Sequence, residues 1–339
     1  MLSASDSAAP VPQGTPPVHP RQTLRFPRVL QLWHLTSLDA PTVASCWTWF
    51  VARTVHAPIL PAELAAMFVA VWMIYATDRL LDASHSQSSS ASHTHLQPRH
   101  VFHLRHRRGL LAWLAFALAP LGLLLTRFPH SELQLDLALL AALAAWFLLI
   151  HRIAPRFRLP KELALSVFFP AAVFLPAFFH SPHLRAQLML PAILFGSLCA
   201  INALFIHRWE ALSISPQIAI KQEDALTHWL LLHLRPLTSL FCIGTAAAVL
   251  LLRGPAYIVA LDQMPHRYRV VILNAVKDPC IWPNIATLYI ITQSAIASGL
   301  SAAGLLVLDR AHLRFKPTDL RALADLVLLS PLLLTPWLR

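Results

Sequence analysis

The chain has 339 residues, of which 56% are hydrophobic and only 13% are charged. Soluble domains usually carry about 25% charged residues, so this composition excludes an ordinary soluble protein and is typical of a protein embedded in a lipid bilayer. The formal net charge is +11, but the cations are scattered among short connections between apolar runs. We therefore expect contacts with anionic lipid or an anionic substrate, and no nucleic acid.

Residues 1–30 are rich in Pro, Ser and Gln, so we expect a disordered N-terminal tail there and one transmembrane domain over residues 31–339. A helix needs about 20 mostly apolar residues to span a bilayer. Nine segments meet this need, at residues 38–58, 62–80, 109–127, 133–151, 162–180, 187–207, 229–252, 285–308 and 319–337. Prolines inside these runs indicate kinked helices. The sequence therefore predicts an all-α polytopic membrane bundle of about nine transmembrane helices around a central cavity.

Two long connections separate these segments. Residues 83–108 are predicted to form a cytoplasmic loop, because they combine a Ser-rich and His-rich run with basic residues at the end. Residues 262–284 resemble a translated intergenic repeat, so we interpret them as an inserted loop, with an edge strand or re-entrant hairpin as the alternative. Most Lys and Arg residues fall on the side of the N-terminus if the helices alternate. The positive-inside rule then predicts a multi-pass protein of the cytoplasmic (inner) membrane with its N-terminus in the cytoplasm.

Ionisable residues near the end of the second segment are the first candidates for chemistry. Asp78 and Asp82 have an i, i+4 spacing, which places both carboxylates on one face of a helix, where they can hold one Mg²⁺ ion. The alternative is a charged helix end with Arg79 at the membrane interface. In the last segment, Arg321 and Asp325 have the same spacing and are predicted to form an ion pair.

Three features together resemble the UbiA superfamily of intramembrane prenyltransferases. They are Asp39-Ala40-Pro41 at the start of the first segment, Asp78-Arg79-Leu80-Leu81-Asp82 at the end of the second, and nine spans with heavy loops after the second, fourth and sixth. That family has an N-D-x-x-D-x-x-x-D motif after its second helix and a D-x-x-x-D motif after its sixth, which bind Mg²⁺ and a prenyl diphosphate. Here Ile74 and Tyr75 replace the leading Asn and Asp of the first motif, and Glu210 is the acidic remnant of the second.

The resemblance implies which residues form the site. Asp78, Asp82 and Glu210 would be catalytic, as ligands of Mg²⁺. The implied substrate-binding residues are Asn202 in the sixth segment and the cations after the fourth, namely Arg152, Arg156, Arg158 and Lys161. Four positive charges in this connection also satisfy the positive-inside rule without any ligand, so both interpretations stay open.

The activity that the resemblance implies is transfer of a prenyl group from a polyprenyl diphosphate to a small acceptor, with Mg²⁺ as cofactor. Two other functions stay open. A non-catalytic descendant of the same fold would bind lipid or a partner, and the missing Asn and Asp of the first motif favour it. A transporter-like membrane protein is the third possibility, although the sequence has no internal repeat and no matched pair of broken helices.

Overall fold

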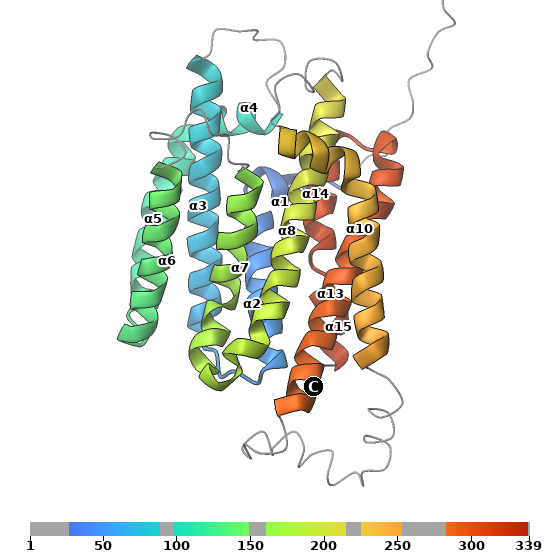
Figure 1. Ribbon diagram of the computed structural model, residues 1–339. Helices are drawn as coiled ribbons and strands as arrows, with labels where there is room; N and C mark the ends of the chain where they lie inside the picture. Colours follow the sequence, from blue (N-terminus) through green and yellow to red (C-terminus); the bar gives the residue numbers. More distant parts are fainter. Residues whose placement is uncertain (1–26, 89–97, 149–160, 215–224, 253–282, 338–339) are drawn as a thin grey trace, which may run out of the picture.

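The described residues of the computed structural model are 27–88, 98–148, 161–214, 225–252 and 283–337. These ranges are helical apart from short connections, and they contain no strand. The long helices lie side by side in one bundle, with neighbours in the chain running in opposite directions (Figure 1). The predicted all-α fold is confirmed for this part of the chain.

The first residue of each long helix lies within a few residues of the first residue of a predicted apolar segment. In chain order the helices are α1 (Arg28–Leu35), α2 (Asp39–Thr54), α3 (Pro61–Ser88), α4 (Pro98–Arg105), α5 (Arg107–Leu125), α6 (His130–Leu148), α7 (Lys161–His180), α8 (Arg185–Ile214), α10 (Ala225–Leu252), α13 (Pro283–Ala311), α14 (Pro317–Val327) and α15 (Pro331–Leu334). Short 3₁₀ turns at Pro182–Leu184, His312–Arg314 and Thr335–Trp337 complete the described elements.

The last predicted segment, 319–337, differs from the structure because it is not one helix. The helix α14 ends at Val327, and the chain starts again as the short α15 at Pro331. Proline has no N–H to continue a helix, and its ring would clash with the carbonyl four residues earlier. Pro331 therefore stands at the first position of a new helix, where its missing N–H costs nothing.

The predicted loop 83–108 is also partly helical. The helix α3 continues to Ser88, α4 occupies Pro98–Arg105 and α5 begins at Arg107. A buried contact holds α4 against the bundle, because His103 is 1% exposed and its Nε2 lies 3.4 Å from the hydroxyl of Ser37. Of the predicted tail, residues 1–26 lie outside the described residues and α1 begins at Arg28. Most of the predicted inserted loop, residues 262–282, also lies outside them.

Within the ranges that the structure describes, five helices are long and apolar enough to cross a membrane: Pro61–Leu81, Arg107–Leu125, Pro182–Leu212, Ala225–Leu252 and Thr287–Arg314. Their large apolar side chains point outward, as Phe116 on α5 and Leu251 on α10 show with exposures of 66% and 80%. Polar side chains point inward, and Ser298 and Ser301 on α13 are fully buried. Exposed apolar patches of this extent need a lipid or protein environment. The distribution therefore supports a membrane-embedded protein.

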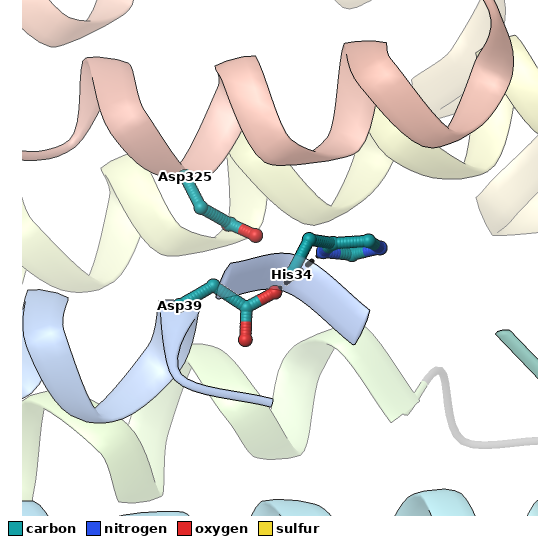
Figure 2. Close-up of side chains that lie close together, drawn as sticks. All are labelled: His34, Asp39 and Asp325. Carbon is teal, nitrogen blue, oxygen red and sulfur yellow. Dashed lines mark hydrogen bonds and ion pairs between the residues drawn. The ribbon is translucent and has the colours of Figure 1, made fainter. Parts of the chain in front are cut away.

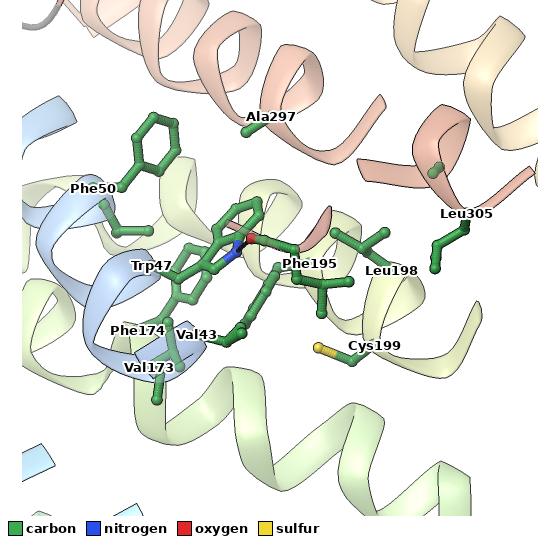
Figure 3. Packing of buried hydrophobic residues seen from close by; sticks show 14 of the residues in the cluster. Val43, Trp47, Phe50, Val173, Phe174, Phe195, Leu198, Cys199, Ala297 and Leu305 are labelled. Atoms are coloured by element: carbon green, nitrogen blue, oxygen red, sulfur yellow. Dashed lines mark hydrogen bonds between the residues drawn. The ribbon is translucent and has the colours of Figure 1, made fainter. Parts of the chain in front are cut away.

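A tryptophan joins the first long helix to the last ones. Trp47 on α2 is completely buried and stacks on Phe195 of α8, with ring centroids 4.2 Å apart (Figure 3). Its indole N–H donates a hydrogen bond to the carbonyl of Leu328 at the end of α14, over 2.8 Å. Because a buried donor without a partner is costly, this bond fixes α2 beside α14. The start of α2 also lies close to the last turn of α14, because oxygen atoms of Asp39 and Asp325 are within 4.8 Å of each other.

Close packing of α7 and α8 depends on a glycine. A Cβ atom added to Gly196 would lie 2.6 Å from the backbone carbonyl oxygen of Ser166, which cannot rotate away. We expect Gly196→Ala to lower the free energy of unfolding by about 1–3 kcal/mol, the usual cost of overpacking. Gly244→Ala is the matched control, since nothing lies within 4 Å of its added Cβ. Thermal unfolding in detergent checks this, and equal melting temperatures for the two variants would contradict it.

Candidate functional site

A short turn at residues 36–38 separates α1 from α2, and two polar side chains on either side of it lie close together. Ser37 in this turn has a φ of 63°, in the left-handed region, and Asp39 follows it as the first residue of α2. Asp39 is completely buried, and its Oδ1 accepts a hydrogen bond from the N–H of Ala40 over 3.0 Å. The Nδ1 atom of His34 lies 2.6 Å from the Oδ2 atom of Asp39 (Figure 2). His34 is also buried, with 2% exposure.

An arginine from α3 neutralises this aspartate. Arg79 Nη2 donates to Asp39 Oδ2 over 3.0 Å, and Arg79 Nη1 donates to the carbonyl of His34 over 2.6 Å. The guanidinium carbon lies 4.4 Å from the centre of the Tyr75 ring, at the distance of a cation–π contact. A buried charge is tolerated when it is paired and hydrogen-bonded. Arg79 therefore ties the start of α2, the end of α1 and the middle of α3 together.

A second carboxylate comes from α14. Asp325 Oδ1 accepts a hydrogen bond from Asn202 Nδ2 of α8 over 3.1 Å. Potential ligand atoms of His34, Asp39 and Asp325 all lie within 4.8 Å of one another, and Figure 2 shows the three side chains converging from separate helices. The other side-chain atom of the amide, Asn202 Oδ1, is buried and has no hydrogen-bond partner in the described part of the chain. We call His34, Asp39, Arg79, Asn202 and Asp325 the central polar cluster.

The distances in the central polar cluster favour hydrogen bonding over metal binding. Two ligands of one ion at bond lengths near 2.1 Å lie roughly 3 Å or more apart, whereas the His34–Asp39 contact is 2.6 Å. The same Asp39 oxygen also accepts from Arg79, and a cation beside a guanidinium would be repelled. Within the described ranges, Asp325 has no ion-pair partner, so it can accept a proton or a hydrogen bond from a bound molecule.

The two aspartates predicted to bind Mg²⁺ both belong to α3, one helical turn apart. Asp78 is half-buried and immediately precedes Arg79 of the central polar cluster. The side chain of Asp82 lies outside the described residues. The acidic motif and the buried cluster are therefore adjacent on the same helix.

Glu210 and Arg321 form an ion pair between α8 and α14. The predicted pair of Arg321 with Asp325 is therefore wrong. Both partners bond to another helix instead, because Asp325 is turned to Asn202 and Arg321 is turned to Glu210. Each of these contacts replaces a local pair on the helix surface, where such pairs are worth only a few tenths of a kcal/mol.

The basic residues predicted after the fourth segment cannot be placed. Arg152, Arg156 and Arg158 lie outside the described residues, and Lys161 starts α7 with its side chain outside them as well. Asn202 is also predicted to bind substrate, and its side chain is described. It belongs to the central polar cluster.

A further buried ionic group was not predicted. Asp309 on α13 is 1% exposed, and its Oδ2 lies 2.5 Å from Arg235 Nε of α10 and 3.7 Å from Arg208 Nη1 of α8. Its Oδ1 accepts the indole N–H of Trp209 over 2.9 Å. With two cations and one indole, this carboxylate is fully satisfied and holds three helices together. An acidic residue at the end of an apolar run is the signal that could have identified both Asp309 and Asp39.

Comparison of the chain with models of known protein families, with curated proteins and with solved structures gave no match. The geometry of the described residues and the motif resemblance are what support a function.

Proposed function

We propose that the chain is a divergent member of the UbiA superfamily that transfers a prenyl group from a polyprenyl diphosphate to a small acceptor. It would cross the cytoplasmic membrane about nine times, with its N-terminus in the cytoplasm and a cavity between the helices. One observation carries the proposal: the acidic motif and the buried central polar cluster meet on α3, at the adjacent residues Asp78 and Arg79. In this proposal a charged donor head and a polar acceptor group would be bound at the same level of α3.

The donor head would lie at the acidic motif. Asp78 and Asp82 would hold Mg²⁺ together with phosphate oxygens, and the ion would supply the positive charge that a leaving diphosphate needs. Glu210 does not fit this ligand set while its carboxylate is paired with Arg321. The cations Arg152, Arg156, Arg158 and Lys161 would bind the diphosphate through charge-assisted hydrogen bonds.

The acceptor would lie at the central polar cluster. Within the described ranges, Asn202 Oδ1 offers a buried oxygen without a hydrogen-bond partner, and Asp325 offers a carboxylate that forms no ion pair. As the bond from the prenyl carbon to the acceptor forms and the bond from that carbon to the diphosphate breaks, the acceptor loses a proton. In this proposal Asp325 would accept it. The pair of Arg79 and Asp39 would keep α2 and α3 in position around this group.

A second function has its own supporting observation. The one acidic remnant of the second family motif, Glu210, is bonded to Arg321 and not available to an ion in this arrangement. A non-catalytic descendant of the fold, which binds an isoprenoid lipid or a partner in the same cavity, would need no metal at that position.

Transfer can be measured with membranes that contain the protein. We expect radiolabel from polyprenyl diphosphates to enter extractable lipid when Mg²⁺ is present, and to stay in the aqueous phase when a chelator removes the ion. Membranes from the same host without the protein are the control for endogenous transferases. A series of donors from short to long, each with a mixture of phenolic and hydroxylated acceptors, covers the unknown chain length. Labelled donor that binds to the purified protein but is never transferred would support the non-catalytic function instead.

A further inference from the structure

A second group of ionisable side chains lies at the other end of α3. Glu63 stands in the first turn of α3, Glu132 in the first turn of α6, and His180 is the last residue of α7. Glu63 and Arg79 are sixteen residues apart on α3, or about 24 Å at the helical rise of 1.5 Å per residue. We call Glu63, Glu132 and His180 the distal triad. Its distance from the central polar cluster means that the proposed transfer reaction does not use it.

The three side chains of the distal triad converge closely. His180 Nε2 lies 3.1 Å from both carboxylate oxygens of Glu63 and 3.9 Å from Glu132 Oε2. One potential ligand atom from each residue can be chosen so that all lie within 4.8 Å of one another. Glu63 and Glu132 are 2% and 1% exposed, and the side chain of His180 is 16% exposed. Three helices thus direct two buried carboxylates and one imidazole to a single point.

One oxygen atom of these carboxylates lacks a hydrogen-bond donor. Glu132 Oε2 is buried and has no hydrogen-bond partner in the described part of the chain, yet it faces His180 Nε2 at 3.9 Å. Nε2 of His180 already lies between the two oxygens of Glu63. Even a protonated imidazole would supply one positive charge to two carboxylates. Since buried carboxylates are costly without enough positive charge, and one imidazole is shared by two of them, the triad as it stands is short of positive charge.

We propose that the distal triad binds one divalent transition-metal ion, with Zn²⁺ as the best fit. Two carboxylates and a neutral imidazole balance a charge of +2. Oxygen together with imidazole nitrogen favours Zn²⁺ over Mg²⁺ and Ca²⁺, which prefer oxygen alone. The 3.1 Å separation of His180 Nε2 from the Glu63 oxygens is close to the roughly 3.3 Å that two ligands span at zinc bond lengths near 2.0–2.1 Å. A small movement of Glu132 completes the set of three.

The ion would tie together the ends of three helices. The helices α3, α6 and α7 carry one ligand each, and Asp136 lies one turn after Glu132 on the same face of α6, half-buried. Asp136 or a water molecule can supply the fourth ligand of a tetrahedral site. In the proposed orientation this end of the bundle faces away from the cytoplasm, but the metal site does not depend on that orientation or on prenyl transfer.

The test uses the full chain in detergent, purified without a histidine tag and stripped with a chelator. Zn²⁺ is titrated in competition with a chromophoric chelator, and bound metal is counted by elemental analysis. Loop histidines between His85 and His106 can add weak binding, so the decisive number is the count of tightly bound ions. We expect one tight ion in the wild type, and a rise in melting temperature when it binds.

Two variants distinguish a triad that binds a metal ion from a triad whose side chains only share a proton. Glu132→Gln keeps the volume but removes a ligand, and His180→Gln keeps a donor for Glu63 but removes the imidazole nitrogen. We expect each to weaken zinc binding at least tenfold and to lose the zinc-dependent rise in melting temperature. His34→Gln, in the central polar cluster, is the matched control and should keep the tight ion. A wild type without a tight ion, or variants that bind Zn²⁺ as the wild type does, would overturn the proposal and leave a proton-sharing triad.

Discussion

Arg79→Met is expected to destabilise the protein severely, because it leaves the carboxylate of Asp39 buried without its cation. Asp39 is completely buried, and Arg79 is 5% exposed. Removal of one partner from a buried ion pair usually costs about 3–5 kcal/mol, since the remaining charge stays in a low-dielectric interior. The lower stability should appear as a lower melting temperature in detergent. Size-exclusion chromatography should show a smaller monodisperse fraction of the protein.

A double variant separates the charge effect from lost packing. In Asp39→Asn/Arg79→Met both charges are gone, and the amide of Asn can still bond to His34, so much of the stability should return. Arg53→Met is the matched control, because Arg53 stands on the same helix as Asp39 but is exposed. If the double variant were as unstable as the sum of the two single variants, the ion pair would not be what holds α2 to α3.

Asp78→Asn and Asp82→Asn are expected to lower Mg²⁺-dependent prenyl transfer by at least about a hundredfold each, on the scale of losing one electrostatic stabiliser of a transition state. The substitutions keep the side-chain volume and remove the charge that would bind the cation. Folding should be little affected, because Asp78 is only half-buried on α3. The test measures initial rates of label transfer and divides them by the amount of folded protein in the same membranes.

The controls for the acidic motif test its separate parts. Asp136→Asn makes the same chemical change on α6, near the distal triad, and should leave transfer unchanged. Glu210→Gln is expected to reduce transfer if Glu210 leaves Arg321 to bind the ion, and unchanged transfer would assign Glu210 to its ion pair alone. Mg²⁺-dependent transfer that persists in Asp78→Asn/Asp82→Asn would refute the metal ligands even if the enzyme assignment is right.

The positions of the long helices could be predicted from the sequence because the lipid bilayer restricts which backbone structures can cross it. Every backbone polar group in the bilayer must be satisfied within its own segment, so a span is a run of about 20 apolar residues and is visible in composition. The irregular ends were harder to predict. The short helix α4 does not follow from hydropathy, because the contact that holds it comes from Ser37 in another part of the chain. The break before Pro331 follows from the missing N–H of proline, which a hydropathy average does not register.

The partners of the charged residues could not be predicted for the same reason. Local spacing predicts Arg321 with Asp325, but Arg321 pairs with Glu210 of a distant helix. The sequence shows Asp39 only as part of a motif, and its bond to Arg79 joins residues 40 positions apart. Burial marks such residues as candidates, since an ionisable side chain inside a bundle needs a partner. Which partner it finds depends on helix packing that one sequence does not display.

The bond between Trp47 and Leu328 has a consequence for biogenesis. It joins residues 281 positions apart, and Gln31 of α1 reaches Asp319 of α14 over a separation of 288. The helices α2 and α3 leave the ribosome long before α14 does, so during synthesis the indole N–H of Trp47 has no α14 carbonyl to bind. Asp325 likewise joins the central polar cluster only after nearly the whole chain has been translated. The α14 contacts of the interior are therefore completed last, after the earlier helices have emerged.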